Sequence, residues 1–150
     1  MTTTSTATLL EDDLRDFLYS NWSLDNAGIT KTDIAFELTD ANEKHPAKPQ
    51  IYVTLFSFRR LQAAEPNLYE FTFVVSVALM NKTVLKTDSA QLLNWRMVDH
   101  VKKMLDNGKP TGWEYVYLSG GVNAGVRLGL LAEENLWDCT VTAAVPWPST

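Results

Sequence analysis

The sequence predicts an α+β domain in which two helices pack on one face of a mostly antiparallel sheet. Three observations support this fold class. Apolar residues recur at helical spacing in two separate segments, and the longer segments between them alternate apolar with polar residues, as strands do. The elements also follow the order α-β-β-β-α-β-β(-β), whereas a doubly wound parallel fold would need strands and helices to alternate throughout.

The first helix is predicted over residues 9–20. Its apolar positions lie three or four residues apart, at Leu10, Leu14, Phe17 and Leu18. Thr8–Glu11 has the form of a capping box, in which a hydroxyl accepts from the first free amides and a glutamate reaches back. The second helix starts by the same logic at Asp88 and ends before Gly108 and Pro110. Its expected buried stripe is Leu93, Met97, Val101, Met104 and Leu105.

Alternation predicts three strands between the helices, over residues 34–38, 50–58 and 69–80. In the last of these the odd positions are all apolar and the even ones mostly small or polar, so the strand should pack on one side only. The sequence between the strands predicts a polar loop at Asp40–Pro49 and a turn at Arg59–Asn67.

After the second helix, strands are predicted at residues 113–119, roughly 125–131, and 136–145. The last residues, PWPST, contain two prolines and should not continue a sheet ladder. We therefore expect one domain over residues 1–150, with 1–7 and 146–150 as loose tails.

The charge is unevenly distributed along the chain. The net charge is −5, and residues 1–43 hold nine acids against Arg15 and Lys31, which gives −7, while the remainder holds nine acids and eleven bases, which gives +2. An acidic first third argues against a groove that grips nucleic acid. No segment is long and apolar enough to span a membrane or to serve as a secretory signal, so we expect a product of the cytoplasm with no membrane partner.

The glycine-rich segment Ser119–Gly129 raises the question of phosphate binding. Its glycines do not have the spacing of a phosphate-binding loop or a dinucleotide fingerprint, and neither the lysine nor the following hydroxyl is present. We expect Ser119–Gly121 to turn between strands, and Gly125 and Gly129 to mark bulges or a close approach of backbones.

The remaining reactive residues do not form a recognisable site. His45 and His100 are isolated, no metal-ligand spacing is present, and Asp99 and His100 point in different directions on a helix. We predict that both histidines lie on the surface and that Cys139 is a small buried apolar residue. The sequence predicts no catalytic residue, no metal and no cofactor, and it does not favour an enzyme.

The order of elements resembles that of the tail-terminator, or tail-completion, proteins of long-tailed bacteriophages. The resemblance covers most of the chain: the helix TLLEDDLRDFLY, the strands QIYVTLFSF and YEFTFVVSVALM, the helix QLLNWRMVDHVKKML, and the closing strands WEYV and WDCTVTA. The resemblance rests on the order of the elements and on their general residue pattern, and on no single diagnostic residue.

The resemblance implies a structural protein of the virion. Proteins of this family form a ring, usually hexameric, on the head-proximal end of the tail tube, where they end tube polymerisation and provide the surface that the head–tail connector binds. The implied partners are further copies of the chain, the tail tube protein and the connector. DNA passes through the lumen without sequence-specific binding, and the family has no catalytic residues to transfer.

We hypothesise that the loops at residues 40–49, 59–68 and 119–125 contact neighbouring copies or the tube, because heterologous contacts of this kind can close a ring. The candidate residues fall into a basic group, an acidic group and the glycine-rich segment: Lys44, Lys48, Arg59 and Arg60; Glu11, Asp12, Asp13 and Asp16; and Gly120, Gly121, Asn123 and Arg127. The basic group would meet the acidic group of an adjacent copy.

Two other functions fit the same sequence. A head–tail connector or other neck protein of the same virion shares the size and the ring symmetry. A small-ligand-binding α+β domain would instead need a deep pocket between a helix and the curved sheet, with convergent polar groups.

Overall fold

The computed structural model describes the backbone of residues 6–38, 48–62, 68–80, 90–120, 123–128 and 133–146. Within these residues the helices and strands follow the predicted order, with one additional short helix and one 3₁₀ turn at Lys31–Asp33. The elements are α1 (Thr6–Ser20), α2 (Leu24–Ala27), β1 (Ala35–Glu37), β2 (Gln50–Gln62), β3 (Leu68–Met80), α3 (Ala90–Asn107), β4 (Tyr115–Leu118), β5 (Asn123–Leu128) and β6 (Glu133–Pro146). The predicted α+β class is confirmed.

The strands form one sheet in the order β1-β2-β3-β6-β4, and β5 also pairs with β6. Because β3 occupies one side of β6, β4 and β5 lie end to end along its other side. β1 runs parallel to the start of β2, and the remaining pairs are antiparallel. The sheet is therefore mostly antiparallel, as the long consecutive strands predict.

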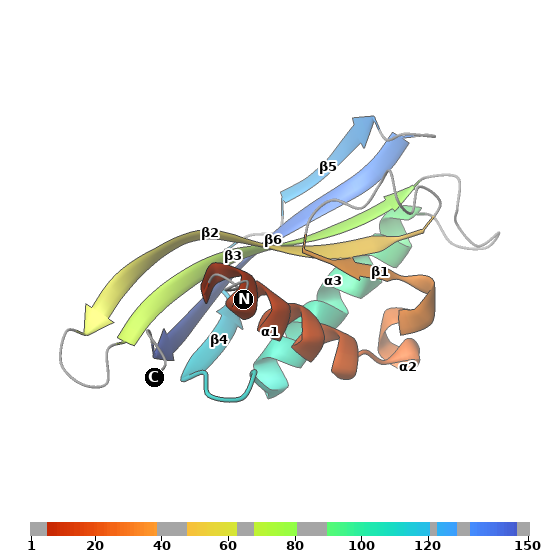
Figure 1. Cartoon of the computed structure of the whole chain (residues 1–150). Coiled ribbons are helices and arrows are strands. Elements are labelled where there is room, and N and C mark those ends of the chain that lie inside the picture. The colour runs from red at the N-terminus through yellow and green to blue at the C-terminus, as the bar shows by residue number, and fades with distance from the viewer. Residues whose placement is uncertain are drawn as a thin grey trace, which may run out of the picture.

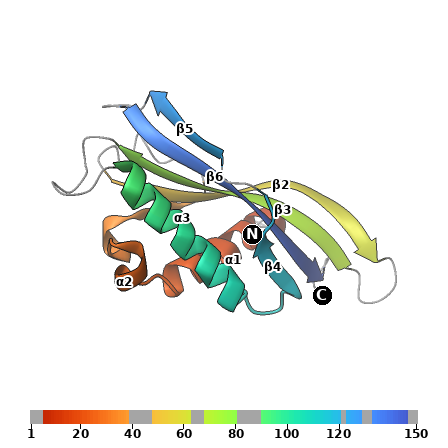
Figure 2. The ribbon, with the colours of Figure 1, turned by 180° about the vertical axis from the view of Figure 1, so that it is seen from behind.

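Both long helices cover the same face of the sheet, and among the described residues the opposite face carries no helix (Figures 1 and 2). This confirms the predicted arrangement. β2 and β3 are long and curved. The C-terminal end of β2 and the N-terminal end of β3 extend beyond α1 (Figure 1). That part of the sheet consequently lies outside the helix layer.

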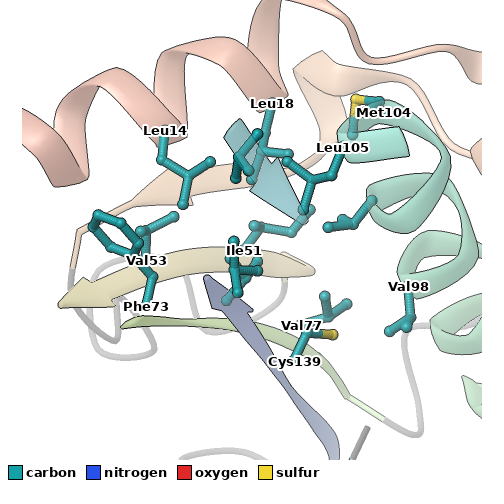
Figure 3. Close-up of a cluster of buried hydrophobic side chains, with 14 of the residues drawn as sticks. Leu14, Leu18, Ile51, Val53, Phe73, Val77, Val98, Met104, Leu105 and Cys139 are labelled. Atoms are coloured by element: carbon teal, nitrogen blue, oxygen red, sulfur yellow. The ribbon is translucent and has the colours of Figure 1, made fainter. Parts of the chain in front are cut away.

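The core lies between the helices and the sheet (Figure 3). Its labelled members are Leu14 and Leu18 of α1, Val98, Met104 and Leu105 of α3, and Ile51, Val53, Phe73, Val77 and Cys139 of the strands. All of them are buried. Truncation of a side chain of this kind to alanine costs about 2–5 kcal/mol, so this layer is the principal source of stability.

β3 shows how sequence alternation produces the buried face. Its odd positions from Phe71 to Leu79 are buried toward the helices. On the other face Ser76 is also buried, and its hydroxyl donates to the Asp138 carboxylate at 2.7 Å. The apolar odd positions are therefore buried as predicted. Packing on one side only is wrong for the second half of the strand, because Ser76 and Ala78 on the other face are buried as well.

Both predicted tails are too long. α1 begins at Thr6 rather than after Thr8, so the proposed capping box lies inside the helix. At the other end, Pro146 is the last residue of β6 and pairs in register with Leu68. A proline tolerates a terminal position in a strand because its missing N–H is needed only for continuation of the ladder.

The predicted turn at Arg59–Asn67 is also wrong for its first four residues. Arg59–Gln62 continue β2, where Arg59 pairs with Glu70 and Arg60 with Tyr69. Their polarity suggested a turn, but a strand that extends beyond the helix layer can expose side chains while its backbone is paired. Register shifts between Leu55 and Ser57 and between Arg60 and Gln62 bend the strand.

Candidate functional site

In the glycine-rich segment, Ser119 and Gly120 follow β4 and pack against β6. The backbone N–H groups of Ser119 and Gly120 both donate to the Thr140 carbonyl, at 2.8 and 3.3 Å. A Cβ at Gly120 would lie 2.7 Å from the Cβ of Thr140, so only glycine fits at this approach. The glycine here serves close backbone packing, and Gly121 lies outside the described residues.

Residues Asn123–Leu128 of this segment form strand β5, although Asn123–Gly125 were expected to belong to a contact loop. Asn123 pairs with Asp138, and Arg127 pairs with Glu134. Gly125 pairs with Leu136 in an uninterrupted register, so the first of its two expected roles, a bulge, is wrong. The second, a close approach of backbones, stays a prediction. Gly129 lies outside the described residues. The long β6 supplies the pairing that makes this glycine-containing segment a strand.

The basic candidates Arg59 and Arg60 lie on the part of β2 that extends beyond the helices. The Arg59 guanidinium forms an ion pair with Glu70 at 2.9 Å, and the Arg60 guanidinium lies 6.0 Å from the centre of the Tyr69 ring. The hydrogen bond from Arg59 lowers the pKa of Glu70. Tyr115 also donates to Glu70, at 3.2 Å, and burial followed by this carboxylate raises the tyrosine pKa.

The same part of β2 also carries exposed apolar side chains. Phe56 is 74% exposed and Phe58 is 54% exposed, and Leu61 is also exposed. Phe58 lies near the ring of Phe71, with 5.9 Å between ring centres. An exposed aromatic and basic surface has the composition that protein interfaces favour.

The acidic candidates on α1 divide into two kinds. Glu11 faces the sheet, where its Oε2 accepts the backbone N–H of Leu55 at 2.6 Å, beside the register shift in β2. This contact gives Glu11 a structural role within one copy. Asp12 and Asp16 lie 2.9 and 3.3 Å from the Arg15 guanidinium.

Asp13 lies in the same acidic group on the outer side of α1. Burial, followed by the charges of Asp16 and Asp12, raises the pKa of Asp13. Asp13 and Asp16 line a surface groove of about 320 Å³ that also includes Lys109, Pro110 and Thr111. The three carboxylates, with Arg15 and Lys109 as the bases beside them, give this side of α1 a net negative charge.

The basic and acidic candidates are not brought together within one copy. Among the described residues, the acid paired with Arg59 is Glu70, and the base paired with Asp12 and Asp16 is Arg15. Lys48 is exposed just before β2, and Lys44 lies outside the described residues. The predicted pairing between the two groups stays a prediction about neighbouring copies.

His100 was predicted to lie on the surface, and this prediction is wrong. The side chain is 3% exposed, its Nε2 accepts the Ser23 backbone N–H at 2.9 Å, and its ring centre lies 4.8 Å from that of Trp22. Burial, followed by the charge of Lys103, lowers its pKa. The signal was present, because His100 stands three residues after Met97 and four before Met104 on the buried stripe.

The side chains around His100 line a cavity. A cavity of about 270 Å³ is lined by Phe17, Asn21, Asn26, His100, Lys103, Met104, Asn107 and Gly108. The part of the chain that the structure describes holds no cluster of His, Cys, Asp or Glu suited to a metal. None of its helices is long and apolar enough to cross a membrane. Cys139 is buried as predicted, and burial raises its pKa to about 12.

Comparison with known proteins finds similarity in structure. No protein-family model and no curated protein matches the chain. Among solved structures, a chain of a structure titled "Virion of native gene transfer agent (GTA) particle" superposes with a TM-score of 0.56 at 15% sequence identity. The similarity covers 95% of this chain and 98% of that chain, so the two share a fold over almost their full length.

Proposed function

We propose that the chain is a structural protein of a phage-like virion. It forms a ring on the head-proximal end of the tail tube, ends tube polymerisation and provides the surface for head joining. The observation that carries the proposal is the end-to-end fold similarity to a chain of a virion particle. The similarity covers 95% of this chain and 98% of that chain.

The surfaces described above support a protein that acts by association. An exposed aromatic and basic end of β2 and an acidic ridge on α1 are unlike surfaces on one chain. Unlike surfaces make heterologous contacts, which close into rings when the rotation between subunits closes. The partners in this proposal are further copies of the chain, the tail tube protein and the head–tail connector, with DNA passing through the lumen.

The proposal is tested with the purified full-length chain. Size-exclusion chromatography with light scattering, followed by negative-stain microscopy, should show closed rings. Added to polymerising tail tube subunits encoded by a neighbouring gene, the protein should shorten the tubes and label one end of each. Rings that bind only the head portal, and leave tube length unchanged, would instead support a neck protein of the same virion.

One observation favours a small-ligand-binding domain as the second candidate. The cavity beside His100 brings the polar side chains of Asn21, Lys103 and Asn107 together between helices, as a ligand site requires. A thermal-shift screen of small polar metabolites tests this function. A reproducible increase in melting temperature that a Lys103→Ala variant loses would support it.

A further inference from the structure

The buried ring of His100 carries a hydrogen-bond donor that the described residues leave unused. Its Nε2 accepts the Ser23 backbone N–H at 2.9 Å, so the neutral ring holds its proton on Nδ1. This nitrogen is buried, and within the part of the chain that the structure describes it has no hydrogen-bond partner. Buried donors in proteins are almost always paired, so the Nδ1–H group points to a molecule bound in the cavity that the ring lines.

Other polar side chains of this cavity supply one cation and two acceptors. Lys103 forms an ion pair with Asp99 at 3.0 Å, and its ammonium group has further N–H donors to offer. Asn21 and Asn107 each donate a side-chain N–H to the carbonyl four residues earlier, at 2.8 and 2.7 Å. The amide oxygens of both asparagines therefore remain available as acceptors. A ligand that fits these groups must both accept and donate hydrogen bonds.

A second groove adjoins the cavity, since Phe17 and Asn21 line both. Its charged members are Asp13, Asp16 and Lys109, two acids and one base, so its net charge is −1. Asp16 is paired with an arginine of α1, whereas Asp13 forms no ion pair among the described residues. Burial, followed by the charges of the neighbouring carboxylates, raises the pKa of Asp13. An additional cation on this side of the cavity would stabilise the ionised carboxylate.

We infer that the cavity beside His100 binds a small zwitterion, namely a free amino acid with an apolar side chain. The ligand carboxylate accepts from the Nδ1–H group of His100 and from the Lys103 ammonium, in charge-assisted hydrogen bonds. The ligand ammonium donates to the amide oxygens of Asn21 and Asn107, and Asn21 also borders the groove that holds Asp13. This inference rests on the second candidate function above and names its ligand.

The size and the apolar lining of the cavity set the kind of amino acid. A volume of about 270 Å³ equals that of about nine waters in the liquid, at about 30 Å³ each, which is room for a molecule of the size of L-valine. Phe17 and Met104 supply an apolar wall for its side chain. Nδ1 exposes less than 1 Å², so the lining side chains must shift as the carboxylate arrives. Lys103 can do so at low cost, because its side chain is 57% exposed.

Calorimetric titration of the full-length chain with L-valine tests the inference. At about 10 mM, a ligand with a Kd of about 1 mM occupies about 90% of the sites, so binding of this strength is measurable. Two analogues separate the contributions of the charged groups, because isovalerate lacks the ammonium group of L-valine and isobutylamine lacks its carboxylate. Each should bind at least about tenfold more weakly than L-valine, since each leaves one set of polar groups unpaired.

Matched variants locate the site. Lys103→Met removes the cation that faces the ligand carboxylate and should weaken L-valine binding at least about tenfold. Lys102→Met makes the same change at the preceding residue, which pairs with Asp106 and does not line the cavity, so binding should be unchanged. Asp13→Asn should weaken binding by a smaller factor, and Asp12→Asn should leave it unchanged. Circular dichroism should show the same helix and strand content in all four variants.

Nitrogen NMR of the histidine rings reports on the contact itself. L-Valine should shift the Nδ1–H resonance of His100 and leave the resonances of His45, the other histidine of the chain, unchanged. An Nδ1–H group that is merely structural, or that pairs only with water, would give the same resonance with and without L-valine, and this result would refute the inference.

The outcomes separate the ligand class from the function. Equal binding of L-valine and isovalerate, or equal binding of L-valine by the unmodified chain and Lys103→Met, would overturn the zwitterion site, while other stabilising compounds would keep the small-ligand function. A chain whose melting temperature no small polar metabolite raises would contradict both. Neither result bears on the proposed ring, which rests on the fold similarity.

Discussion

Replacement of His100 by leucine tests the buried contact that joins α3 to the segment after α1. The histidine Nε2 accepts the Ser23 backbone N–H at 2.9 Å, and its ring packs edge-on against Trp22. Leucine has a similar volume but cannot accept a hydrogen bond. The substitution therefore removes the acceptor and keeps most of the apolar contact.

The magnitude follows from these two contacts. A buried N–H that loses its acceptor costs about 1–3 kcal/mol, and loss of an edge-to-face aromatic contact costs about 0.5–1.5 kcal/mol. Since Ser23 is only partly buried, we expect His100→Leu to lower the free energy of unfolding by about 2 kcal/mol near neutral pH. Glutamine retains an acceptor oxygen, so His100→Gln should lower it less.

The pH dependence gives a second measurement with a defined sign. Burial lowers the pKa of folded His100 below its ordinary value of 6.5, so the unfolded chain binds more protons than the folded chain in that window. The stability contribution is complete above pH 6.5 and decreases as the pH falls toward the folded pKa. For one histidine the loss between about pH 7.5 and about pH 5.5 is at most about 1.4 kcal/mol.

Urea denaturation, followed by tryptophan fluorescence at both pH values, measures both effects. The other titrating groups, His45 included, are present in both proteins, so they cancel in the comparison of the unmodified chain with His100→Leu. The variant should lose less stability on acidification than the unmodified chain. An equal loss in the two proteins would refute the assignment of a neutral, buried His100.

Three further predictions concern the fold. Glu11→Ala should lower the free energy of unfolding by about 1–2 kcal/mol, because the Leu55 backbone N–H loses its acceptor. Asp12→Ala removes a partly exposed ion pair and should change the free energy of unfolding by less than about 1 kcal/mol. Urea titration compares the two variants. Phe73→Ala should lower the free energy of unfolding by about 3–5 kcal/mol, because the substitution leaves a cavity in the core. Phe56→Ala removes an exposed side chain and should change the free energy of unfolding of the monomer by less than about 0.5 kcal/mol. Equal effects of the two substitutions would contradict the burial of Phe73 in the core. The Cys139 thiol, with its pKa raised to about 12 by burial, should react with a disulfide reagent at pH 8 only after urea unfolds the chain, as absorbance of the released thiolate reports.

Local pattern was sufficient for most of the architecture. The spacing of Leu10, Leu14 and Leu18 predicted α1, and the alternation of apolar residues over 69–80 predicted the buried face of β3. Patterns of this kind are reliable because a helix or strand with one apolar side must bury that side. The same logic correctly predicted that Cys139 is buried.

The candidate contact residues were less predictable, because the sequence does not record which charged groups meet within one copy. Glu11 and Asp12 are adjacent acids, yet one caps a strand amide and the other pairs with Arg15. Arg59 reads as part of a polar turn, yet β3 pairs with its backbone and Glu70 with its side chain. These differences depend on which face of α1 meets β2 and on the register between β2 and β3.

By itself the sequence determined the α+β class, the order of its elements, and the burial of residues with regular spacing, since these depend on neighbours within a few positions of the chain. Only the tertiary structure decided the parallel pairing of β1, the extension of β2 beyond the helices, and the closeness of Gly120 to Thr140. It also decided that His100 is a buried acceptor for Ser23, 77 positions earlier. Contacts between segments so distant in sequence depend on how the layers pack, and packing is a property of the whole chain.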